Sequence, residues 1–433
     1  MLSGILIIIV FGIMALLMAT KKLPNLFALP LMAIAVAIVA GYPLMGEEGI
    51  LEYVIVSGTT YLAETMLLIL LACWLSRIMS KTGVTQTVIK KAAELGGDKP
   101  IVVAFALLAV TAFLFTTLYG TGAAMLVSGI VLPILLSVGV PPVAAANLFL
   151  LAFGIGYSLN TVNMSEVTVV AGIEYSDLFM PAVVLAVCAA LLIIGYLILL
   201  FRKGARRVAF AAPVNDEEIE QEIPPVKGMR GLLACLTPLL IVLLTLVFKV
   251  PAMACFYIGI VWLALMTFRG SFKKYANMMV SAFAEAGKDA APAIGLCIGI
   301  GMALRALGGD IAVKAIGPFV NAITPSNVVI LVIGACILAP LVLYRGPLNS
   351  YGLGAGLLVS MIAVGRFSPV VLGTVFYALC RWANDGCPTS TVVVYTSNYI
   401  GSDSVTVTNK MFFARWILTA VTIVAIAAFG FGM

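Results

Sequence analysis

The chain has 433 residues, of which 63% are hydrophobic and 10% are charged, and its formal net charge is +6. A water-soluble fold cannot bury that much apolar surface, so the composition excludes a soluble protein and indicates one embedded in a lipid bilayer. The basic residues stand in short polar segments rather than in one stripe, so no nucleic-acid partner is expected. The chain lacks histidine, and its eight cysteines form no C-x-x-C pair, which argues against zinc sites and disulfides.

Apolar segments long enough to cross a bilayer occur in two sets of five. The first set lies near 2–20, 24–42, 59–80, 142–172 and 178–201. The second set lies near 231–248, 251–268, 280–304, 369–400 and 411–431. In each set the third segment precedes a shorter one, 82–95 or 310–323, which is expected to lie along the membrane interface. The first segment lacks a basic leader and a cleavage site, so it is expected to be a retained span.

Two stretches of the chain repeat each other: LYGTGAAMLVSGIVLPILLSVGV from Leu118 and LYRGPLNSYGLGAGLLVSMIAVG from Leu343. Tyr119 and Tyr344 are 225 positions apart (344 − 119), and the polar breaks that follow keep nearly the same spacing. Paired apolar segments interrupted by glycine, proline and polar residues at corresponding places predict a transport site near the middle of the bilayer.

Glycine, proline and polar residues crowd the middle of 99–140 and of 325–367. We interpret each stretch as a re-entrant hairpin, because backbone that turns inside the membrane is tolerated where it is buried in protein or lines a cavity. The alternative is an ordinary turn between two spans. The Lys and Arg distribution favours hairpins, since the basic segments then fall on one face of the membrane.

The expected fold is an all-α polytopic membrane protein built from an inverted repeat. Each repeat has about five transmembrane helices plus one re-entrant hairpin, and five is an odd number, so both termini are expected outside. Residues 1–202 form the first repeat, 203–229 a cytoplasmic linker and 230–433 the second repeat. Broken helices are expected at 142–172 and 369–400.

Each half interrupts a span with polar residues, SLNTVNMSE from Ser158 and RWANDGCPTST from Arg381. Pro388 cannot donate a helical hydrogen bond, and Gly386 weakens the turn before it. Unwound backbone exposes oxygens that can coordinate Na⁺, while the resuming half-helix directs its N-terminus toward an anion. An ordinary kinked span is the alternative.

The transport site is therefore expected around the hairpin tips and the breaks. The candidate substrate-binding residues are Thr121, Gly122, Asn160, Arg345, Asn349, Asn384, Thr389 and Ser390. The candidate coupling-cation ligands are Asn163, Ser165, Glu166, Asp385 and Thr391. Arg345, at the tip of the second hairpin, can bind a carboxylate through two hydrogen bonds or can neutralise Asp385. Arg381 lies one helical turn before Asp385 and can also pair with it.

Other charged residues in the apolar segments have simpler explanations. Arg77 lies near the end of its span and is expected to extend its guanidinium to the interface. Glu285, Lys288 and Asp289 share one helix face and are expected to form a local cluster of salt bridges.

Three segments resemble the ion transporter superfamily of secondary carriers, and most nearly its citrate–metal symporter and gluconate permease branches. They are ATKKLPNLFALPLMAIAVAIVAGYP, LYGTGAAMLVSGIVLPILLSVGVPP and PTSTVVVYTSNYIG. The resemblance implies an elevator mechanism and a homodimer. The first hairpin tip reads Tyr-Gly-Thr-Gly from Tyr119, where citrate–metal carriers have an acidic run, and this argues against a metal–citrate substrate.

The sequence thus predicts a secondary active transporter of a bacterial cytoplasmic (inner) membrane. It would couple uptake of a small organic anion, a carboxylate, to Na⁺ or H⁺. The alternative is a Na⁺/H⁺ antiporter on the same fold, in which Asp385 and Glu166 exchange cations and Arg345 is a structural counter-ion. An enzyme is not expected, because the chain lacks a paired-Asp metal motif and a nucleophile arrangement. Beyond a possible Na⁺, no cofactor is expected.

Overall fold

The computed structural model describes residues 2–19, 22–97, 99–202, 226, 228–346, 348–349 and 354–430. The described residues form helices joined by turns and contain no strand. The expected linker, 203–229, falls almost wholly outside the described residues, and so does the side chain of Arg345. The all-helical architecture agrees with the fold class expected for a polytopic membrane protein.

The first half of the chain contains a long central helix, a hairpin and a broken helix. Its helices are α1 (Leu2–Ala19), α2 (Asn25–Ala40), the π-helical η1 (Ile50–Val56), α3 (Ser57–Thr60), α4 (Ala63–Lys81), α5 (Val84–Leu95), α6 (Pro100–Phe115), α7 (Thr121–Ser137), α8 (Pro142–Ser158), α9 (Thr161–Ala171) and α10 (Tyr175–Arg202). The amphipathic segment expected at 82–95 is α5, and the hairpin stretch 99–140 is α6 and α7.

The second half repeats this order of elements. Its helices are α11 (Gly228–Cys235), α12 (Thr237–Leu246), α13 (Ala252–Thr267), α14 (Phe272–Gly308), α15 (Asp310–Ile323), α16 (Val328–Leu338), the 3₁₀-helical η3 (Ala339–Arg345), α17 (Gly354–Val364), α18 (Pro369–Gly386), α19 (Thr391–Tyr399), α20 (Ser404–Lys410) and α21 (Phe412–Ala428). The long helix α14 corresponds to α4, the amphipathic α15 to α5, and the broken pair α18–α19 to α8–α9.

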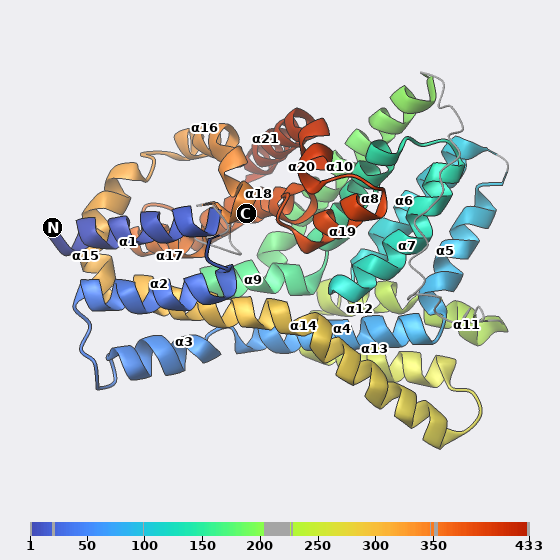
Figure 1. The fold of residues 1–433 in the computed structure, drawn as a ribbon, viewed down its shortest axis with the longest axis horizontal. Helices are drawn as coiled ribbons and strands as arrows, with labels where there is room; N and C mark the ends of the chain where they lie inside the picture. The colour runs from blue at the N-terminus through green and yellow to red at the C-terminus, as the bar shows by residue number, and fades with distance from the viewer. Residues whose placement is uncertain are drawn as a thin grey trace.

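The two long helices α4 and α14 lie side by side and run in opposite directions (Figure 1). Contacts along the two helices demonstrate this. Gly58 of α3, which precedes α4 in the same span, approaches Met302 of α14, whereas Arg77 near the end of α4 contacts Asp289, earlier in α14. Small residues allow the backbones to come close: a Cβ on Gly58 would lie 2.7 Å from the Met302 Cα. As a result, α5 and α15 lie at opposite ends of the molecule (Figure 1). The inverted repeat stays a prediction.

Three continuous helices of the described residues are long and apolar enough to cross a bilayer, and up to seven spans result if each of four bent helix pairs counts as one. The three are Ile50–Lys81, Tyr175–Arg202 and Phe272–Gly308. The sequence predicts about ten crossings. The difference arises because other apolar helices are short: α2 ends after 16 residues at Gly41, whose φ is 91°, and α13 begins only after Pro251.

Both hairpin stretches contain a backbone position with positive φ. The first turns at Gly120 (φ 94°) between α6 and α7, where the absence of a Cβ permits this conformation. The second kinks within η3 at Tyr344 (φ 54°), a conformation that costs a non-glycine residue free energy. The hairpins lie toward opposite ends of the molecule (Figure 1). Their re-entrant course through a bilayer stays a prediction.

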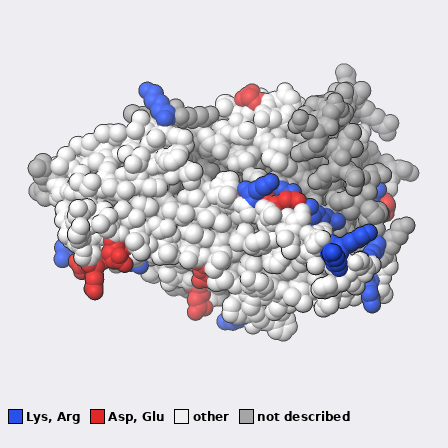
Figure 2. All heavy atoms as spheres, turned by 60° about the horizontal axis from the view of Figure 1, so that its bottom comes forward, with Lys and Arg blue, Asp and Glu red and all other residues white. Residues whose placement is uncertain are grey.

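The outer surface carries few charges. Figure 2 shows a face that is mostly uncharged, with the largest acidic group near its left end and most basic side chains toward its right. Large apolar side chains such as Leu191 (63% exposed), Val261 (57%) and Leu265 (63%) lie on the outside. An apolar exterior of this extent indicates contact with lipid.

Candidate functional site

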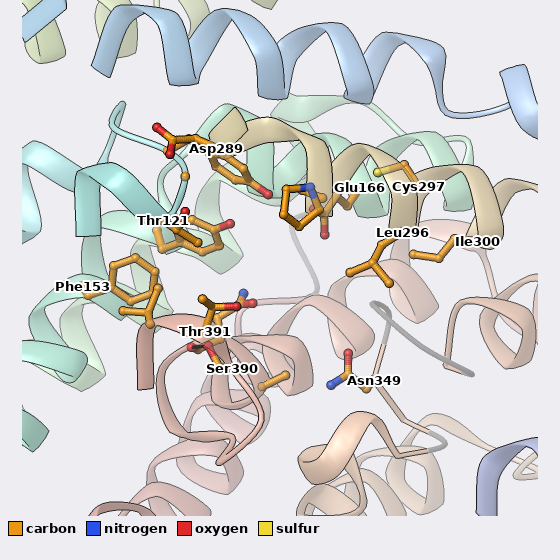
Figure 3. A pocket seen from close by; sticks show the side chains of 18 of the residues that line it. Thr121, Phe153, Glu166, Asp289, Leu296, Cys297, Ile300, Asn349, Ser390 and Thr391 are labelled. Atoms are coloured by element: carbon orange, nitrogen blue, oxygen red, sulfur yellow. Dashed lines mark hydrogen bonds between the residues drawn. The ribbon is translucent and has the colours of Figure 1, made fainter. Parts of the chain in front are cut away.

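One cavity of about 160 Å³ lies where both halves of the chain meet (Figure 3). A single water needs only about 10–15 Å³ measured in this way, so the cavity has room for several waters or a small solute. It is lined by the tip of the first hairpin, by α8, α9 and α14, and by the second break. Six of the residues expected in the site line it: Thr121, Glu166, Asn349, Asn384, Ser390 and Thr391.

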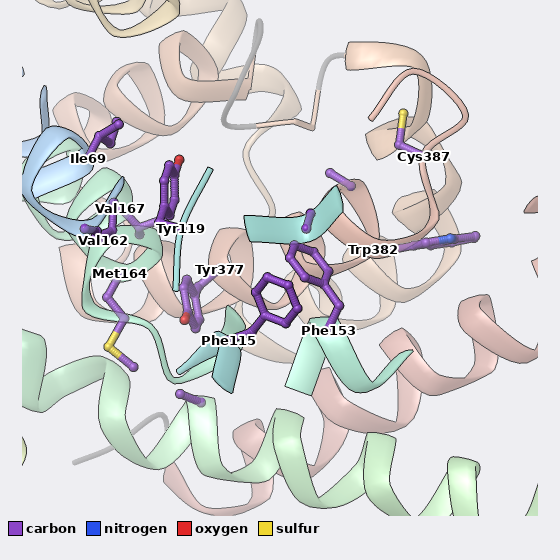
Figure 4. Close-up of a cluster of buried hydrophobic side chains, with 14 of the residues drawn as sticks. Ile69, Phe115, Tyr119, Phe153, Val162, Met164, Val167, Tyr377, Trp382 and Cys387 are labelled. Carbon is purple, nitrogen blue, oxygen red and sulfur yellow. The ribbon is translucent and has the colours of Figure 1, made fainter. Parts of the chain in front are cut away.

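An aromatic wall closes one side of this cavity. Phe153 packs edge-on against Phe115, with ring centroids 4.7 Å apart, and stacks on Tyr157 at 4.9 Å. Tyr119, the repeated residue of the hairpin tip, stacks on Tyr157 at 5.5 Å. Figure 4 shows Phe115 and Phe153 side by side in the buried cluster. The only signal of this wall in the sequence is the repeated tyrosine of the hairpin tips, which does not by itself predict an aromatic cluster.

Asn160 lies behind the cavity and holds the first break together. Its side chain is fully buried and caps α9 by accepting a hydrogen bond from the Val162 N–H at 2.9 Å. Its amide nitrogen donates to the Phe115 and Leu118 carbonyls at 3.0 and 3.2 Å. Asn160 therefore ties α9 to the end of the first hairpin helix.

Asn163 and Asn384 connect the two breaks. The Asn384 amide donates to the Asn163 side-chain oxygen at 3.1 Å, and the Asn163 amide donates to the Tyr377 hydroxyl at 3.3 Å. The Tyr377 hydroxyl in turn donates to the Ser158 carbonyl at the end of α8, at 2.5 Å. These bonds form a bridge from α18 to the α8–α9 break. Ser165, close by in α9, donates its hydroxyl to the Val162 carbonyl at 2.7 Å.

The carbonyls at the end of α18 already accept hydrogen bonds from side chains. Ser390 donates to the Asn384 carbonyl at 2.9 Å, and Thr408 donates to the Gly386 carbonyl at 3.0 Å. Arg415 donates to the Asp385 carbonyl. The backbone oxygens expected to be available for Na⁺ thus have donors within the chain. Thr389 contacts the Cys387 Sγ at 3.0 Å and is not among the cavity residues.

Asp385 is buried between two arginines and does not line the cavity. Its carboxylate contacts Arg381 at 3.0 Å and Arg415 at 2.8 Å, and only 1% of the residue is exposed. The Arg381 pair is the i,i+4 pair weighed from the sequence. The pairing of Arg415 with Asp385 was not predicted. Its only sign in the sequence is the position of an arginine inside the apolar run FFARWILTAV, where an ionisable residue needs a partner.

Arg77 does not extend to the interface but binds Asp289 of α14 through two hydrogen bonds, 2.6 Å from Nε to Oδ2 and 2.9 Å from Nη2 to Oδ1. Glu285 lies 3.5 Å from Arg77 and 2.6 Å from Lys81. The expected cluster on one face of α14 is thus a network between two helices, because α4 brings its cations alongside the carboxylates. Asp289 lines the cavity.

Gly122 lies against this ion pair. A Cβ at that position would overlap the Arg77 guanidinium and come within 2.7 Å of the Asp289 Oδ2. The hairpin tip therefore rests on the pair, and only glycine fits there.

Two helix N-termini open on the cavity. The N-cap residue of α7, Gly120, has no side chain to offer, and the N-cap residue of α19, Ser390, gives its hydroxyl to Asn384. The first backbone N–H groups of a helix lack partners within it and carry partial positive charge, which attracts anions. By contrast, the N-terminus of α9 is capped by Asn160.

The charged side chains among the cavity residues are Glu166 and Asp289. Within the described residues, no group of three or more Cys, Asp or Glu is placed to hold a metal ion. A cation in this site would rely on Glu166 together with neutral oxygens.

The model of a known protein family matches most of this chain. Residues 34–343 match the family model of DcuC, the C4-dicarboxylate anaerobic carriers. The chain belongs to this family. It is therefore an integral membrane transporter of the secondary carrier class and not an enzyme. The family match supports a secondary carrier, as the sequence predicts, but not the citrate–metal or gluconate branches in particular.

Two solved structures share the fold. The YdaH transporter of Alcanivorax borkumensis is 15% identical, with a TM-score of 0.62 over 94% of this chain and 98% of that chain. MtrF of Neisseria gonorrhoeae, described within a class of antimetabolite efflux pumps, is 14% identical, with a TM-score of 0.57 over 92% of this chain and 93% of its own. A search of curated proteins found no match. At these identities the likeness extends to the fold alone.

Proposed function

We propose that the protein carries C4-dicarboxylates across the membrane, together with a coupling cation. The observation that carries this proposal is the meeting of two N-termini, those of α7 and α19, at one cavity. A C4-dicarboxylate has a carboxylate at each end. Each N-terminus can receive one of them, so the two ends of the ligand are recognised by different halves of the chain.

The other lining groups suit such a ligand. Hydroxyls of Thr121, Ser390 and Thr391 and the amides of Asn349 and Asn384 can donate hydrogen bonds to carboxylate oxygens. The aromatic wall can contact the short carbon chain between the carboxylates. Arg345 belongs to this proposal from its place at the second hairpin tip, where a guanidinium can bind a carboxylate through two hydrogen bonds.

Glu166 is the proposed coupling residue. An ionised carboxylate in the cavity repels an incoming dianion, so a proton or Na⁺ at Glu166 lowers the free energy of anion binding. Asp385 is a poorer candidate, because two arginines already hold its carboxylate away from the cavity. Anion and cation binding then favour each other, which is what coupling requires.

The proposed movement is of the elevator type. The bridge between Asn163, Tyr377 and Asn384 joins both broken helices into one unit. This unit would move with the hairpins against the paired α4 and α14. The inverted repeat, the homodimer, the location in a bacterial inner membrane and the outside termini belong to the same proposal.

Uptake of labelled succinate into proteoliposomes tests the function. We expect uptake that depends on an inward Na⁺ or H⁺ gradient and that is competed by fumarate but not by a monocarboxylate. Sodium-driven proton movement that needs no dicarboxylate, with no succinate uptake, would support the antiporter instead. Protein-free liposomes serve as the control, because they show how much succinate enters by passive leak.

A further inference from the structure

The Arg77–Asp289 pair has an unusual place for a structural ion pair, because Asp289 lines the cavity and Arg77, which is not itself a lining residue, contacts it. The side chains are 25% and 10% exposed, so the pair is neither sealed in the interior nor fully open to solvent. Both carboxylate oxygens of Asp289 are engaged by one guanidinium. This two-point geometry is the one that a guanidinium offers to any carboxylate.

We propose that Arg77 binds one carboxylate of the substrate. While the carrier is empty, the Asp289 carboxylate occupies the position on Arg77 that the substrate carboxylate would take. The inference rests on the proposed function and adds a cationic side chain to the proposed site. A substrate carboxylate would replace Asp289 on Arg77 and keep the same two hydrogen bonds. The exchange therefore costs little on the side of Arg77.

The neighbouring charges keep Arg77 in position during this exchange. Glu285 lies 3.5 Å from Arg77, and Lys81 contacts Glu285 at 2.6 Å and Ser281 at 3.4 Å. Glu285 is not among the cavity residues, so it can hold the guanidinium from behind while Asp289 leaves from the front. The released Asp289 carboxylate then favours a cation that enters with the anion, because an uncompensated charge in a partly buried site is costly.

The first hairpin would sense the exchange directly. Its tip rests on the pair through Gly122, where a Cβ would overlap Arg77, and through Gly120, where a Cβ would lie 3.4 Å from the Asp289 Cβ. With no space between tip and pair, a change of partner on Arg77 must shift the tip. Through Asp289, binding of the substrate would therefore change the position of the first hairpin tip.

Binding of succinate by the purified full chain tests the proposal, with four forms compared at fixed pH and Na⁺ concentration by isothermal titration calorimetry. The forms are the parent, Arg77→Lys, Asp289→Asn and the matched control Glu94→Gln, which neutralises an exposed carboxylate of α5 outside the cavity. Arg77→Lys should weaken binding about tenfold or more, because lysine keeps the charge but loses the planar fork. Asp289→Asn should bind several-fold more tightly, since the internal competitor is removed, and with less dependence on Na⁺ or pH. Glu94→Gln should bind within about twofold of the parent.

The outcomes separate the two proposals. If the parent binds no C4-dicarboxylate, the proposed function fails. If the parent binds while Arg77→Lys and Asp289→Asn both bind like the parent, the function stands and the role of Arg77 is wrong. If Asp289→Asn loses binding as severely as Arg77→Lys, Asp289 only positions Arg77, and the exchange is overturned. Thermal unfolding of each variant shows whether a loss of binding reflects misfolding.

Discussion

Two ion-pair clusters in this protein use the same chemistry in different surroundings. Asp385 lies between Arg381 and Arg415 with side-chain exposures of 2%, 7% and 2%, and it faces away from the cavity. In the cluster of Arg77 and Asp289 the side chains are 25% and 10% exposed, and Asp289 lines the cavity. A sealed cluster can only hold its helices together, whereas an accessible one can exchange partners. Because the two clusters differ in burial and not in the kind of charge, we assign a structural role to the Asp385 cluster and propose a transport role for the Arg77–Asp289 cluster.

Removing the sealed carboxylate should have the largest effect on stability. Asp385→Ala leaves Arg381 and Arg415 buried without their shared anion, which should cost about 3–5 kcal/mol. Thermal unfolding in detergent measures this, with Asp289→Ala as the matched change in the accessible cluster. The comparison between clusters is wrong if both substitutions lower the unfolding temperature equally.

Each cluster is in contact with one glycine, Gly154 at Asp385 and Gly122 at Arg77, so the same substitution can be tested at both. A Cβ on Gly154 would overlap the Asp385 carboxylate, just as one on Gly122 would overlap Arg77. Gly154→Ala should cost about 1–3 kcal/mol through overpacking, because the sealed cluster cannot move aside. Gly122→Ala should lower stability less and succinate affinity more. Gly129→Ala, in the same helix as Gly122 but with open space around it, should leave both unfolding temperature and affinity near the parent values.

Sequence patterns predicted residues that share one cavity, but not the ion pairs around it. The repeat of the hairpin tips and breaks led to Thr121, Asn384 and Ser390, which the fold brings to one cavity. Helix positions followed from apolar length, with errors where Gly or Pro shortened a helix. The partner of Arg77 could not be read in this way, because Asp289 is 212 positions away and no local period encodes such a contact. For the same reason, the sequence predicts that Asp385 can bind a cation and does not show that Arg415, from another helix, already pairs with it.

The first break offers a test of intermediate size. Asn160→Ala removes the cap of α9 and both hydrogen bonds to the hairpin carbonyls, and it should cost about 1–2 kcal/mol. Asn160→Ser restores a capping oxygen but not the two donated bonds, so it should recover only part of the loss. Equal unfolding temperatures for the two variants would mean that the tie to the hairpin, and not the cap, is what Asn160 contributes.

Glu166→Gln should have the smallest effect on stability and the clearest effect on coupling. Glu166 lines the cavity, and glutamine keeps nearly the same shape, so unfolding should shift by less than about 0.5 kcal/mol. The neutral side chain no longer repels a dianion and no longer needs a cation, so succinate should exchange across the membrane without responding to a Na⁺ or H⁺ gradient. Counterflow of labelled succinate measures exchange, and gradient-driven accumulation measures coupling. Retained accumulation in Glu166→Gln would transfer the coupling role to the accessible cluster, where Asp289 is the other cavity carboxylate. The double variant with Asp289→Asn would then be the one to lose it.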